Sequence, residues 1–161
     1  MRFTKMHGAG NDYVLLDARG QEFDWPGLAR EMCDRHYGIG ADGLLLVAPS
    51  SVADIRMRMF NPDGSEAEMC GNGIRCFAKY VVERGIVALD GRALRVETWN
   101  GVLDVTPLMD GQGRVKLARV SMGEPRFGAD EIPVRLLHGE RGERLDIIIM
   151  PLDINKRVVD I

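Results

Sequence analysis

Two stretches of the chain place apolar residues three and four positions apart, as a helix with one buried face requires. In the longer stretch the apolar positions are Ile74, Phe77, Ala78, Val81 and Val82. Gly85 follows them and predicts the end of this helix. In the shorter stretch Asp24 caps the start and Pro26 lies in the first turn. Gly38 then stops a helix that ends near His36. The pattern therefore predicts one long helix and one short helix.

Strands are predicted where apolar residues alternate with polar ones or form short continuous runs. Ile55, Met57 and Met59 alternate with two arginines, and residues 44–47 are continuously apolar. Asn100-Gly101 between two alternating segments is typical of a hairpin turn. The predicted strands cover residues 3–6, 13–17, 44–47, 55–59, 94–98, 102–106 and 115–120, with weaker candidates at 132–136 and 145–150. The fold class is therefore α+β, with a mostly antiparallel sheet.

The 161 residues have the composition of an ordinary globular domain, with 45% hydrophobic and 28% charged residues. The net charge of −3 and the scattered basic residues argue against nucleic acid or an anionic membrane as a partner. No apolar run approaches the length of a membrane span, and the first residues do not resemble a signal peptide. The sequence therefore predicts a cytoplasmic protein with enough apolar material for one core.

The three cysteines, Cys33, Cys70 and Cys76, fit neither a disulfide framework nor the paired spacing of a metal site. They are predicted to be reduced thiols, and neither a metal nor a cofactor is expected. His7 and His36 also lack partners at metal-ligand spacing, which favours ordinary hydrogen-bonding or core histidines. Cys76 would point about 120° away from Cys70 around the helix, so packing is its predicted role.

Cys70 is the strongest candidate for chemistry, because Cys70-Gly71-Asn72-Gly73 stands where the long helix is predicted to begin. Free amides and the helix dipole at this end favour an anion, so a thiolate would be stabilised there. The amides of Gly71 and Asn72 would be free to hold a carboxylate. The alternative is a structural cysteine that is buried as a small hydrophobic residue. The flanking glycines favour the functional interpretation.

Two further polar segments, residues 8–12 and 61–64, are predicted to be loops at strand ends, where functional groups collect. Asn11 and Asn61 can both donate and accept hydrogen bonds, which suits the ammonium and carboxylate groups of an amino acid. Taken singly, each asparagine is better explained as a turn residue. Together with the Cys70 segment, the three loops predict one pocket. The glycines of residues 38–43 lie between a helix and a strand, the reverse of a dinucleotide-binding motif.

Four blocks of the sequence occur in an order that is specific to one enzyme family. They are residues 3–13 (FTKMHGAGNDY), 35–43 (RHYGIGADG), 60–65 (FNPDGS) and 70–73 (CGNG). In this order they resemble the diaminopimelate epimerase family, and the resemblance extends from residue 1 to about residue 134. Racemases of the proline type are related and also work without a cofactor. However, they carry His where Asn72 stands and lack the opening Lys-Met-His-Gly block.

The resemblance implies a cofactor-independent isomerase that converts LL-2,6-diaminopimelate to the meso form in lysine biosynthesis. It also implies an α+β lobe whose mostly antiparallel strands wrap around a central helix. In this family two such lobes face each other, and each contributes one acid/base cysteine. Cys70 would be the first of these catalytic cysteines. The amides of Gly71 and Asn72 would bind the α-carboxylate of the substrate. Asn11 and Asn61 would line the pocket.

The sequence also departs from the family pattern. Some members carry Gln where Gly43 stands, and the second-lobe motifs, including a second Cys-Gly-small-Gly helix start, do not occur within these residues. Residues 1–122 are therefore expected to form the N-terminal lobe, and residues 123–161 a crossover segment and divergent tail, not a complete second lobe. A truncated gene product or a half-length protein would each explain this. A homodimer or a complementing second lobe is the expected macromolecular partner.

Three functions agree with these observations. The leading hypothesis is a lobe of a diaminopimelate epimerase. The alternatives are a non-catalytic lobe that binds an amino-acid carboxylate, and a related isomerase with another substrate. Inversion at a carbon requires a base on one face and an acid on the other, so Cys70 alone cannot perform both steps efficiently. The activity of this chain by itself is therefore left open by the sequence.

Overall fold

The computed structural model describes residues 1–123, 152–154 and 157–159. The chain divides into two compact units, Met1–Met122 and Gly123–Ile161. The first unit holds an eight-stranded sheet and the two helices of the described residues. None of the described helices is long and apolar enough to span a membrane.

The second unit contains a short antiparallel hairpin, formed by β9 (Leu152–Ile154) and β10 (Arg157–Val159). The sequence pattern does not predict an element in this segment. The weaker strand candidates at 132–136 and 145–150 lie outside the described residues.

The large sheet has the strand order β1-β2-β3-β4-β6-β7-β8, with β5 paired to β4. Its strands are β1 (Thr4–Gly8), β2 (Asn11–Asp17), β3 (Gly43–Ala48), β4 (Ile55–Phe60), β5 (Glu66–Ala67), β6 (Leu94–Thr98), β7 (Gly101–Met109) and β8 (Val115–Val120). Only β2–β3 and β4–β6 are parallel pairs, and a helix lies in each of their crossovers. The sheet is therefore mixed and mostly antiparallel, as the alternation patterns predicted.

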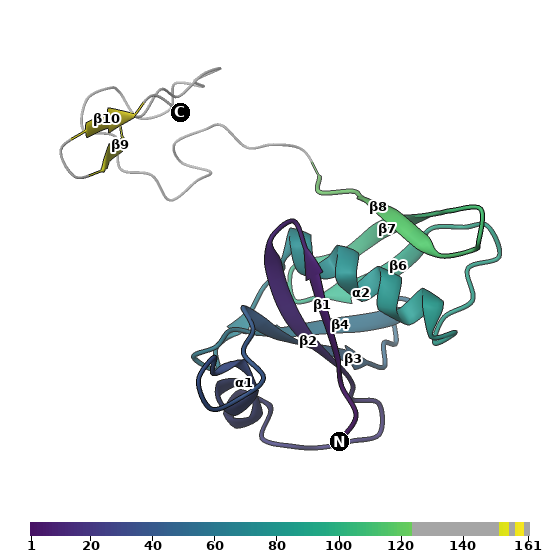
Figure 1. Ribbon diagram of the computed structural model, residues 1–161. Helices are drawn as coiled ribbons and strands as arrows, with labels where there is room; N and C mark the ends of the chain where they lie inside the picture. The colour runs from purple at the N-terminus through teal and green to yellow at the C-terminus, as the bar shows by residue number, and fades with distance from the viewer. Residues whose placement is uncertain (124–151, 155–156, 160–161) are drawn as a thin grey trace, which may run out of the picture. The chain divides into compact units, whose positions relative to one another are not determined.

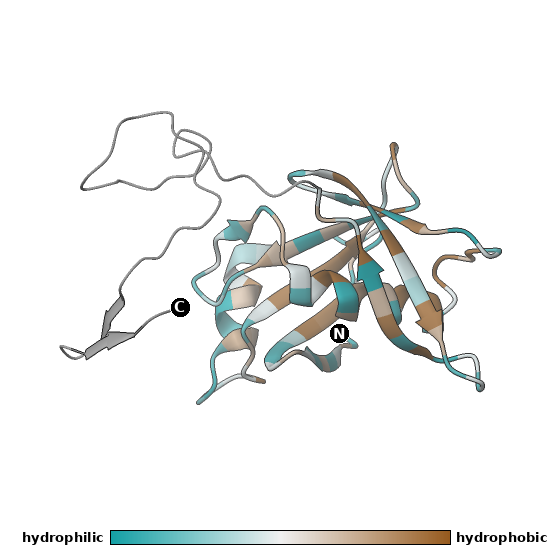
Figure 2. Cartoon of the chain, turned by 90° about the horizontal axis from the view of Figure 1, so that it is seen from above, coloured by the Kyte–Doolittle hydropathy of each residue, from teal (hydrophilic) through white to brown (hydrophobic). Residues whose placement is uncertain are grey.

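The strands surround the longer helix, α2 (Gly71–Glu83), which contacts β1, β2, β3, β7 and β8 (Figure 1). The shorter helix, α1 (Trp25–Cys33), contacts β3 and β4. Hydrophobic stretches run along the strands of the sheet in Figure 2. The arrangement gives the sheet two apolar faces, one for each helix.

The continuous apolar run of β3 follows from this double burial. Leu44 and Leu46 belong to the core cluster around α1, whereas Leu45 and Val47 belong to the cluster around α2. Neighbouring side chains of a strand point to opposite faces, so a strand that is covered on both sides has no position for a polar residue. All four side chains are fully buried.

The long helix agrees with its predicted apolar pattern. Ile74, Phe77, Ala78 and Val81 are fully buried, and Val82 is half-buried. Gly85 has a φ of +64°, the left-handed conformation that ends many helices and that glycine adopts without strain. Cys70 is the N-cap residue of this helix.

The short helix ends earlier than predicted, at Cys33 instead of near His36. Asp34 leaves the helical conformation, with a ψ of 124°, and its carboxylate accepts hydrogen bonds from the amides of His36 and Tyr37. This local turn competes with the next helical turn, a common effect of aspartate that the apolar spacing does not reveal. Cys33 lies on the buried side of α1, in agreement with its apolar position.

The first predicted loop is also shorter than expected. Most of residues 8–12 belongs to the β1–β2 hairpin, in which Gly8 pairs with Asn11 and His7 with Asp12. Only Ala9 and Gly10 form the turn, and both have positive φ values, 50° and 92°. Two central residues of this kind are typical of a tight hairpin turn, whose twist matches the flanking strands. Asn11 is therefore held by a strand and not by a mobile loop.

Replacing Phe77 by alanine should lower the free energy of unfolding by about 3–5 kcal/mol, because the ring is fully buried against the sheet and its loss leaves a cavity. The same truncation at Phe3, which is 47% exposed, should cost less than about 1 kcal/mol. Urea denaturation followed by circular dichroism measures both values. Equal losses would contradict the central position of α2 in the core.

Candidate functional site

The predicted site residues lie at one edge of the sheet. β2 and β3 are parallel and both begin there, with Tyr13 paired to Gly43. β4 runs antiparallel to β3 and ends there, with Phe60 paired to Leu44. Asn11 begins β2, and Asn61 follows the last residue of β4. The polar groups that the sequence analysis selected therefore gather where these three strand ends meet.

Cys70 caps the first turn of α2 with its sulfur. Its backbone is extended, with φ of −140° and ψ of 112°, so the side chain turns back over the helix start. The Sγ atom accepts a hydrogen bond from the amide of Gly73 at 3.3 Å. The hydroxyl oxygen of Tyr13 lies 3.1 Å from the same sulfur. Cys70 is half-buried, so the sulfur is held in place without being closed off.

The other two thiols have different surroundings. Cys33 is 2% exposed, and burial raises its pKa to about 11. Cys76 is 4% exposed, and burial likewise raises its pKa above the ordinary value. Both thiols are therefore kept in the neutral form at physiological pH. Cys70 is the one thiol of the three that lies at a helix start and is only partly buried.

The first amides of α2 form a potential anion site. The opening N–H groups of a helix have no partner within the helix. Here the Cys70 sulfur accepts from one of them, that of Gly73, and the Cys70 carbonyl accepts the first regular helical bond from Ile74. The amides of Gly71 and Asn72 have no acceptor among the residues that the structure describes. Two adjacent free donors with the helix dipole behind them can hold a carboxylate.

The side chain of Asn72 connects the helix start to Asn11. Its amide nitrogen donates to Asn11 Oδ1 at 2.8 Å, and its oxygen accepts from Arg75. Asn11 in turn donates through Nδ2 to Asp42 Oδ2 at 3.0 Å. The orientation of the Asn11 amide is therefore fixed from both ends. Its second N–H is left to donate toward a ligand.

A charged cluster supports this chain of hydrogen bonds. Arg35 contacts Asp12 and Asp42, each at 2.7 Å, and Lys5 lies 3.2 Å from Asp12. The hydrogen bond from Arg35 is the main reason that the pKa of Asp12 is lowered. The hydrogen bond from Asn11 is the main reason that the pKa of Asp42 is lowered. Both carboxylates are therefore charged at neutral pH, and Asp42 is a permanent acceptor for Asn11.

Asn61 shares the sheet edge but has local partners. Its backbone amide donates to the carbonyl of Ser65 at 2.8 Å, and its Nδ2 donates to Ser65 Oγ at 2.9 Å. Neither Asn11 nor Cys70 is among its hydrogen-bonding partners in the described residues. The structure thus brings Cys70, Gly71, Asn72 and Asn11 into one connected group, with Asn61 at the same edge in a separate turn.

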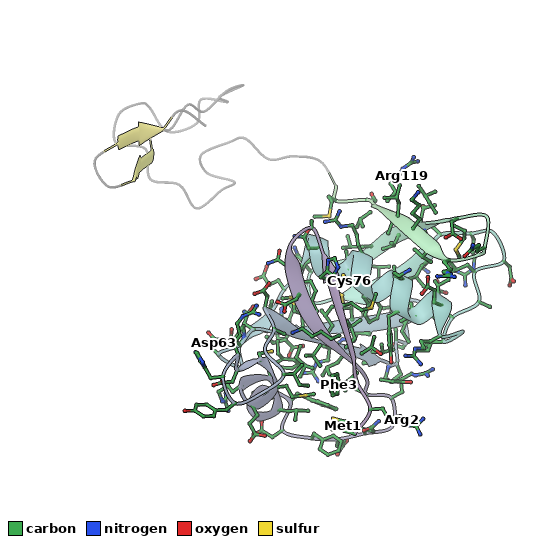
Figure 3. The ribbon with its side chains drawn as sticks, in the orientation of Figure 1. Met1, Arg2, Phe3, Asp63, Cys76 and Arg119 are labelled. Carbon is green, nitrogen blue, oxygen red and sulfur yellow. The ribbon has the colours of Figure 1, made fainter. Side chains whose placement is uncertain are left out.

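β1 approaches the start of α2 closely at Gly8, which explains why a residue without a side chain occupies this position. A β-carbon added at Gly8 would lie 2.9 Å from Cys76 Sγ and 3.2 Å from the carbonyl oxygen of Asn72. Both distances are shorter than side chains tolerate without movement. Figure 3 shows Cys76 between the β1–β2 hairpin and α2. The role of Cys76 is packing between these two elements.

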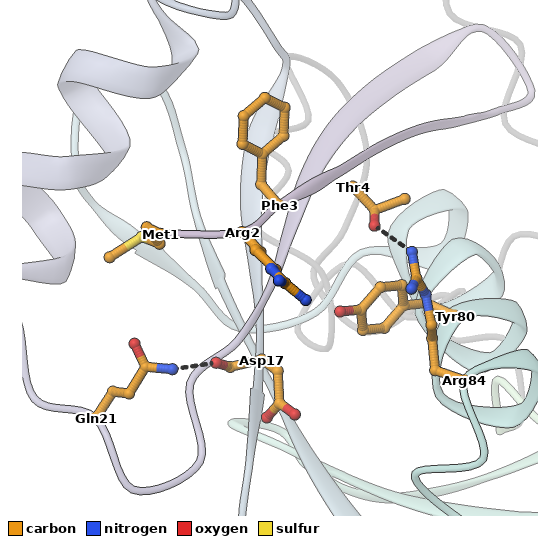
Figure 4. Close-up of a pocket in the computed structure, with 8 residues that line it drawn as sticks. All are labelled: Met1, Arg2, Phe3, Thr4, Asp17, Gln21, Tyr80 and Arg84. Carbon is orange, nitrogen blue, oxygen red and sulfur yellow. Dashed lines mark hydrogen bonds between the residues drawn. The ribbon is translucent and has the colours of Figure 1, made fainter.

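A separate hollow of about 680 Å³ lies beside the N-terminal end of β1. Figure 4 shows its lining residues, which are Met1, Arg2, Phe3, Thr4, Asp17, Gln21, Tyr80 and Arg84. Arg84 donates to the hydroxyl of Thr4 at 3.2 Å across it. None of the predicted site residues lines this hollow. Among the residues that the model describes, no group of three His, Cys, Asp or Glu side chains could hold a metal ion.

Tyr13, Asp42 and Arg75 were not predicted as site residues from the sequence. Tyr13 directly follows the Asn11-Asp12 pair, but its apolar ring fits a core position and hides the role of its hydroxyl. Asp42 is 31 residues from Asn11 in sequence, and only the parallel pairing of β2 and β3 brings them together. Arg75 lies three residues after Asn72, a spacing at which helical side chains meet, so it could have been found.

Comparisons with known proteins give a consistent result. The family model for diaminopimelate epimerase matches residues 3–128. A diaminopimelate epimerase of Pelotomaculum thermopropionicum is 58% identical over an alignment of 137 residues that covers 83% of this chain and 48% of that protein. One of Caldanaerobacter subterraneus is 56% identical over 135 residues, covering 84% of this chain and 48% of that protein. The chain therefore spans about half the length of the curated relatives it matches.

A solved structure shares the fold at lower identity. It is a probable proline racemase from Agrobacterium radiobacter, which matches with a TM-score of 0.58 and 18% identity over 74% of this chain and 41% of that chain. This likeness shows the fold alone. Together with the sheet around α2, it confirms the α+β class that the sequence predicted.

Iodoacetamide should modify Cys70 well before Cys33 and Cys76 at neutral pH. Cys70 is half-buried at a helix start, whereas burial raises the pKa of both other thiols and covers their sulfurs. Mass spectrometry of the three cysteine peptides, sampled over time, measures the order. Modification of Cys76 before Cys70 would contradict the assignment of Cys70 as the accessible thiol.

Proposed function

The chain belongs to the diaminopimelate epimerase family, and from this premise we propose that it supplies one half of an active site for epimerisation of 2,6-diaminopimelate. The proposed reaction converts the LL form to the meso form without a cofactor, in lysine biosynthesis. The observation that carries the proposal is the Cys70 sulfur at the start of α2, beside two free amides. Identity of 58% to a diaminopimelate epimerase supports the choice of substrate.

The helix start would hold the α-carboxylate of the substrate. The amides of Gly71 and Asn72 supply two donors, and the 13-residue helix adds the positive end of its dipole. Asn11 would add a third donor from β2, because its amide is oriented by Asp42 and Asn72. Asn61 would line the same pocket from the end of β4.

Cys70 would exchange the proton at the substrate Cα. In the thiolate form it removes the proton, and in the thiol form it returns one. The negative charge that develops on removal is spread into the carboxylate, where the helix amides already donate. Such donors are aligned before the reaction, so they need not reorient as the charge forms.

Inversion of the carbon requires a second acid/base group on the opposite face of the substrate. Cys33 and Cys76 cannot supply it, since both are buried in the core clusters and both have raised pKa values. Within residues 1–161, Cys70 therefore accounts for one of the two proton transfers. The other would come from the half of the enzyme to which this chain does not align in its relatives.

The proposal is tested by deuterium incorporation at the Cα of diaminopimelate in heavy water. The 161-residue chain alone should show little or no epimerisation. Addition of the remaining half of the Pelotomaculum thermopropionicum relative should restore it, and Cys70→Ala should abolish it again. Cys33→Ala serves as the matched control and should retain activity, because Cys33 lies under α1. Inversion by the chain alone that survives Cys70→Ala would contradict the two-thiol mechanism.

Two other outcomes would replace the proposal. Binding of diaminopimelate in calorimetry without exchange in the combined sample would favour a binding lobe. Exchange on another amino acid, with none on diaminopimelate, would favour a related isomerase.

Replacing Asn11 or Asn61 by alanine should weaken binding of diaminopimelate by about 1–3 kcal/mol, the cost of leaving a charged group of the ligand without its partner. Isothermal titration calorimetry measures the affinity. Asn100→Ala is the matched control, since Asn100 is exposed in the turn between β6 and β7 and should leave binding unchanged. A loss of melting temperature with unchanged affinity would make either residue structural.

A further inference from the structure

The hydroxyl of Tyr13 has one partner among the described residues, and that partner is Cys70 Sγ at 3.1 Å. Tyr13 is only 1% exposed, so water does not satisfy this hydroxyl. Buried tyrosine hydroxyls almost always make a hydrogen bond, because an unpaired one costs free energy. The sulfur of Cys70 must therefore be the group that satisfies it.

The direction of this hydrogen bond follows from the chemistry of the two groups. Burial, and then the hydrogen bond to the neighbouring sulfur, raises the pKa of Tyr13 well above its ordinary value. The phenol therefore keeps its proton throughout the working pH range. A thiolate can only accept a hydrogen bond, and a thiol is a weak donor. The O–H of Tyr13 is thus the donor and the sulfur is the acceptor.

The sulfur then has two donors, one from each neighbouring element. Tyr13 donates from β2, and the amide of Gly73 donates from α2 at 3.3 Å. Hydrogen bonds to a charged acceptor are about twice as strong as those between neutral groups, so both contacts favour the thiolate. When the sulfur is protonated, its S–H cannot occupy either of these two directions.

We propose that Tyr13 is a positioning residue for Cys70, whose hydroxyl stabilises the thiolate and turns the S–H of the thiol form away from β2. In the proposed function, the sulfur then faces the Cα of a substrate whose carboxylate is held by the amides of Gly71 and Asn72. The proposal rests on that function only for the identity of the substrate, because the hydrogen bond belongs to the protein without ligand.

Other titratable groups near this pair do not bond to the sulfur. Cys76 and Arg75 belong to the same helix, α2, and Asp42 lies in the segment before β3. Arg75 is engaged with Asn72, and Asp42 with Arg35 and Asn11. A change at the Tyr13 hydroxyl leaves these groups as they are, so a difference in Cys70 reactivity reports on the hydroxyl.

The test is the pH dependence of Cys70 alkylation by iodoacetamide in the 161-residue chain, followed by mass spectrometry of its peptide. Tyr13→Phe keeps the buried ring and removes only the donor. The alkylation profile should move to higher pH, with alkylation about tenfold slower at pH 7, because the thiolate loses one of its two donors. Tyr80→Phe is the matched control, because Tyr80 lies ten residues along α2 from Cys70 and should leave the profile unchanged.

An unchanged profile in a folded Tyr13→Phe protein would overturn the proposal. If this variant fails to fold, the direction of the hydrogen bond is tested in the unaltered chain by Raman spectroscopy. The difference between the spectra of the unaltered chain and of Cys70→Ala isolates the S–H stretching band of Cys70. A band at the position of a non-donating thiol supports the proposal, and a band shifted to lower frequency means that the S–H donates to Tyr13 and overturns it. A shifted profile without diaminopimelate exchange in the combined sample would count against the proposed function alone.

Discussion

The contact between the β1–β2 hairpin and the first turn of α2 is the constraint on which the site depends. Gly8 permits it, because any side chain at this position would collide with Cys76 and with the backbone of Asn72. Two polar contacts then tie the elements together, Asn11 to Asn72 and Tyr13 to Cys70. The positions of the sulfur and of the free amides therefore follow from a backbone distance that is set by packing.

Charge is kept near this contact but not at the sulfur. Asp12 and Asp42 are ionised, and the charges of Lys5 and Arg35 neutralise them. This cluster contacts Asn11 through Asp42. Uncharged donors surround Cys70 itself, namely the Tyr13 hydroxyl and the Gly73 amide. A thiolate in these surroundings is stabilised by two directed hydrogen bonds and not by a counterion. A permanent cation beside the sulfur would make it a weaker base, so neutral donors suit the proton exchange that is proposed for Cys70.

The sequence predicted the elements more reliably than the contacts between them. The helix that begins after Cys70 and the alternation in β4 depend on local spacing, and both were found. The end of α1 and the extent of the first loop were wrong, because the side chain of Asp34 and a two-residue turn decide them. The pairing of Asn11 with Asp42 could not be predicted from local pattern, since it arises from the parallel register of β2 and β3. The contact of the Tyr13 hydroxyl could not be predicted either, because Tyr13 is buried among core residues.

The arrangement also explains how, in the proposed function, one lobe could bind a carboxylate group and still perform only one of two proton transfers. A carboxylate is a planar group that one helix start can hold from one side, so the amides of Gly71 and Asn72 need no counterpart across the substrate. A proton transfer with inversion is different, because its two steps take place on opposite faces of one carbon. Cys33 and Cys76 are both buried in the core clusters. In the proposed function, binding of the carboxylate can therefore be local to this fold, whereas inversion also needs a second acid/base group opposite the sulfur of Cys70.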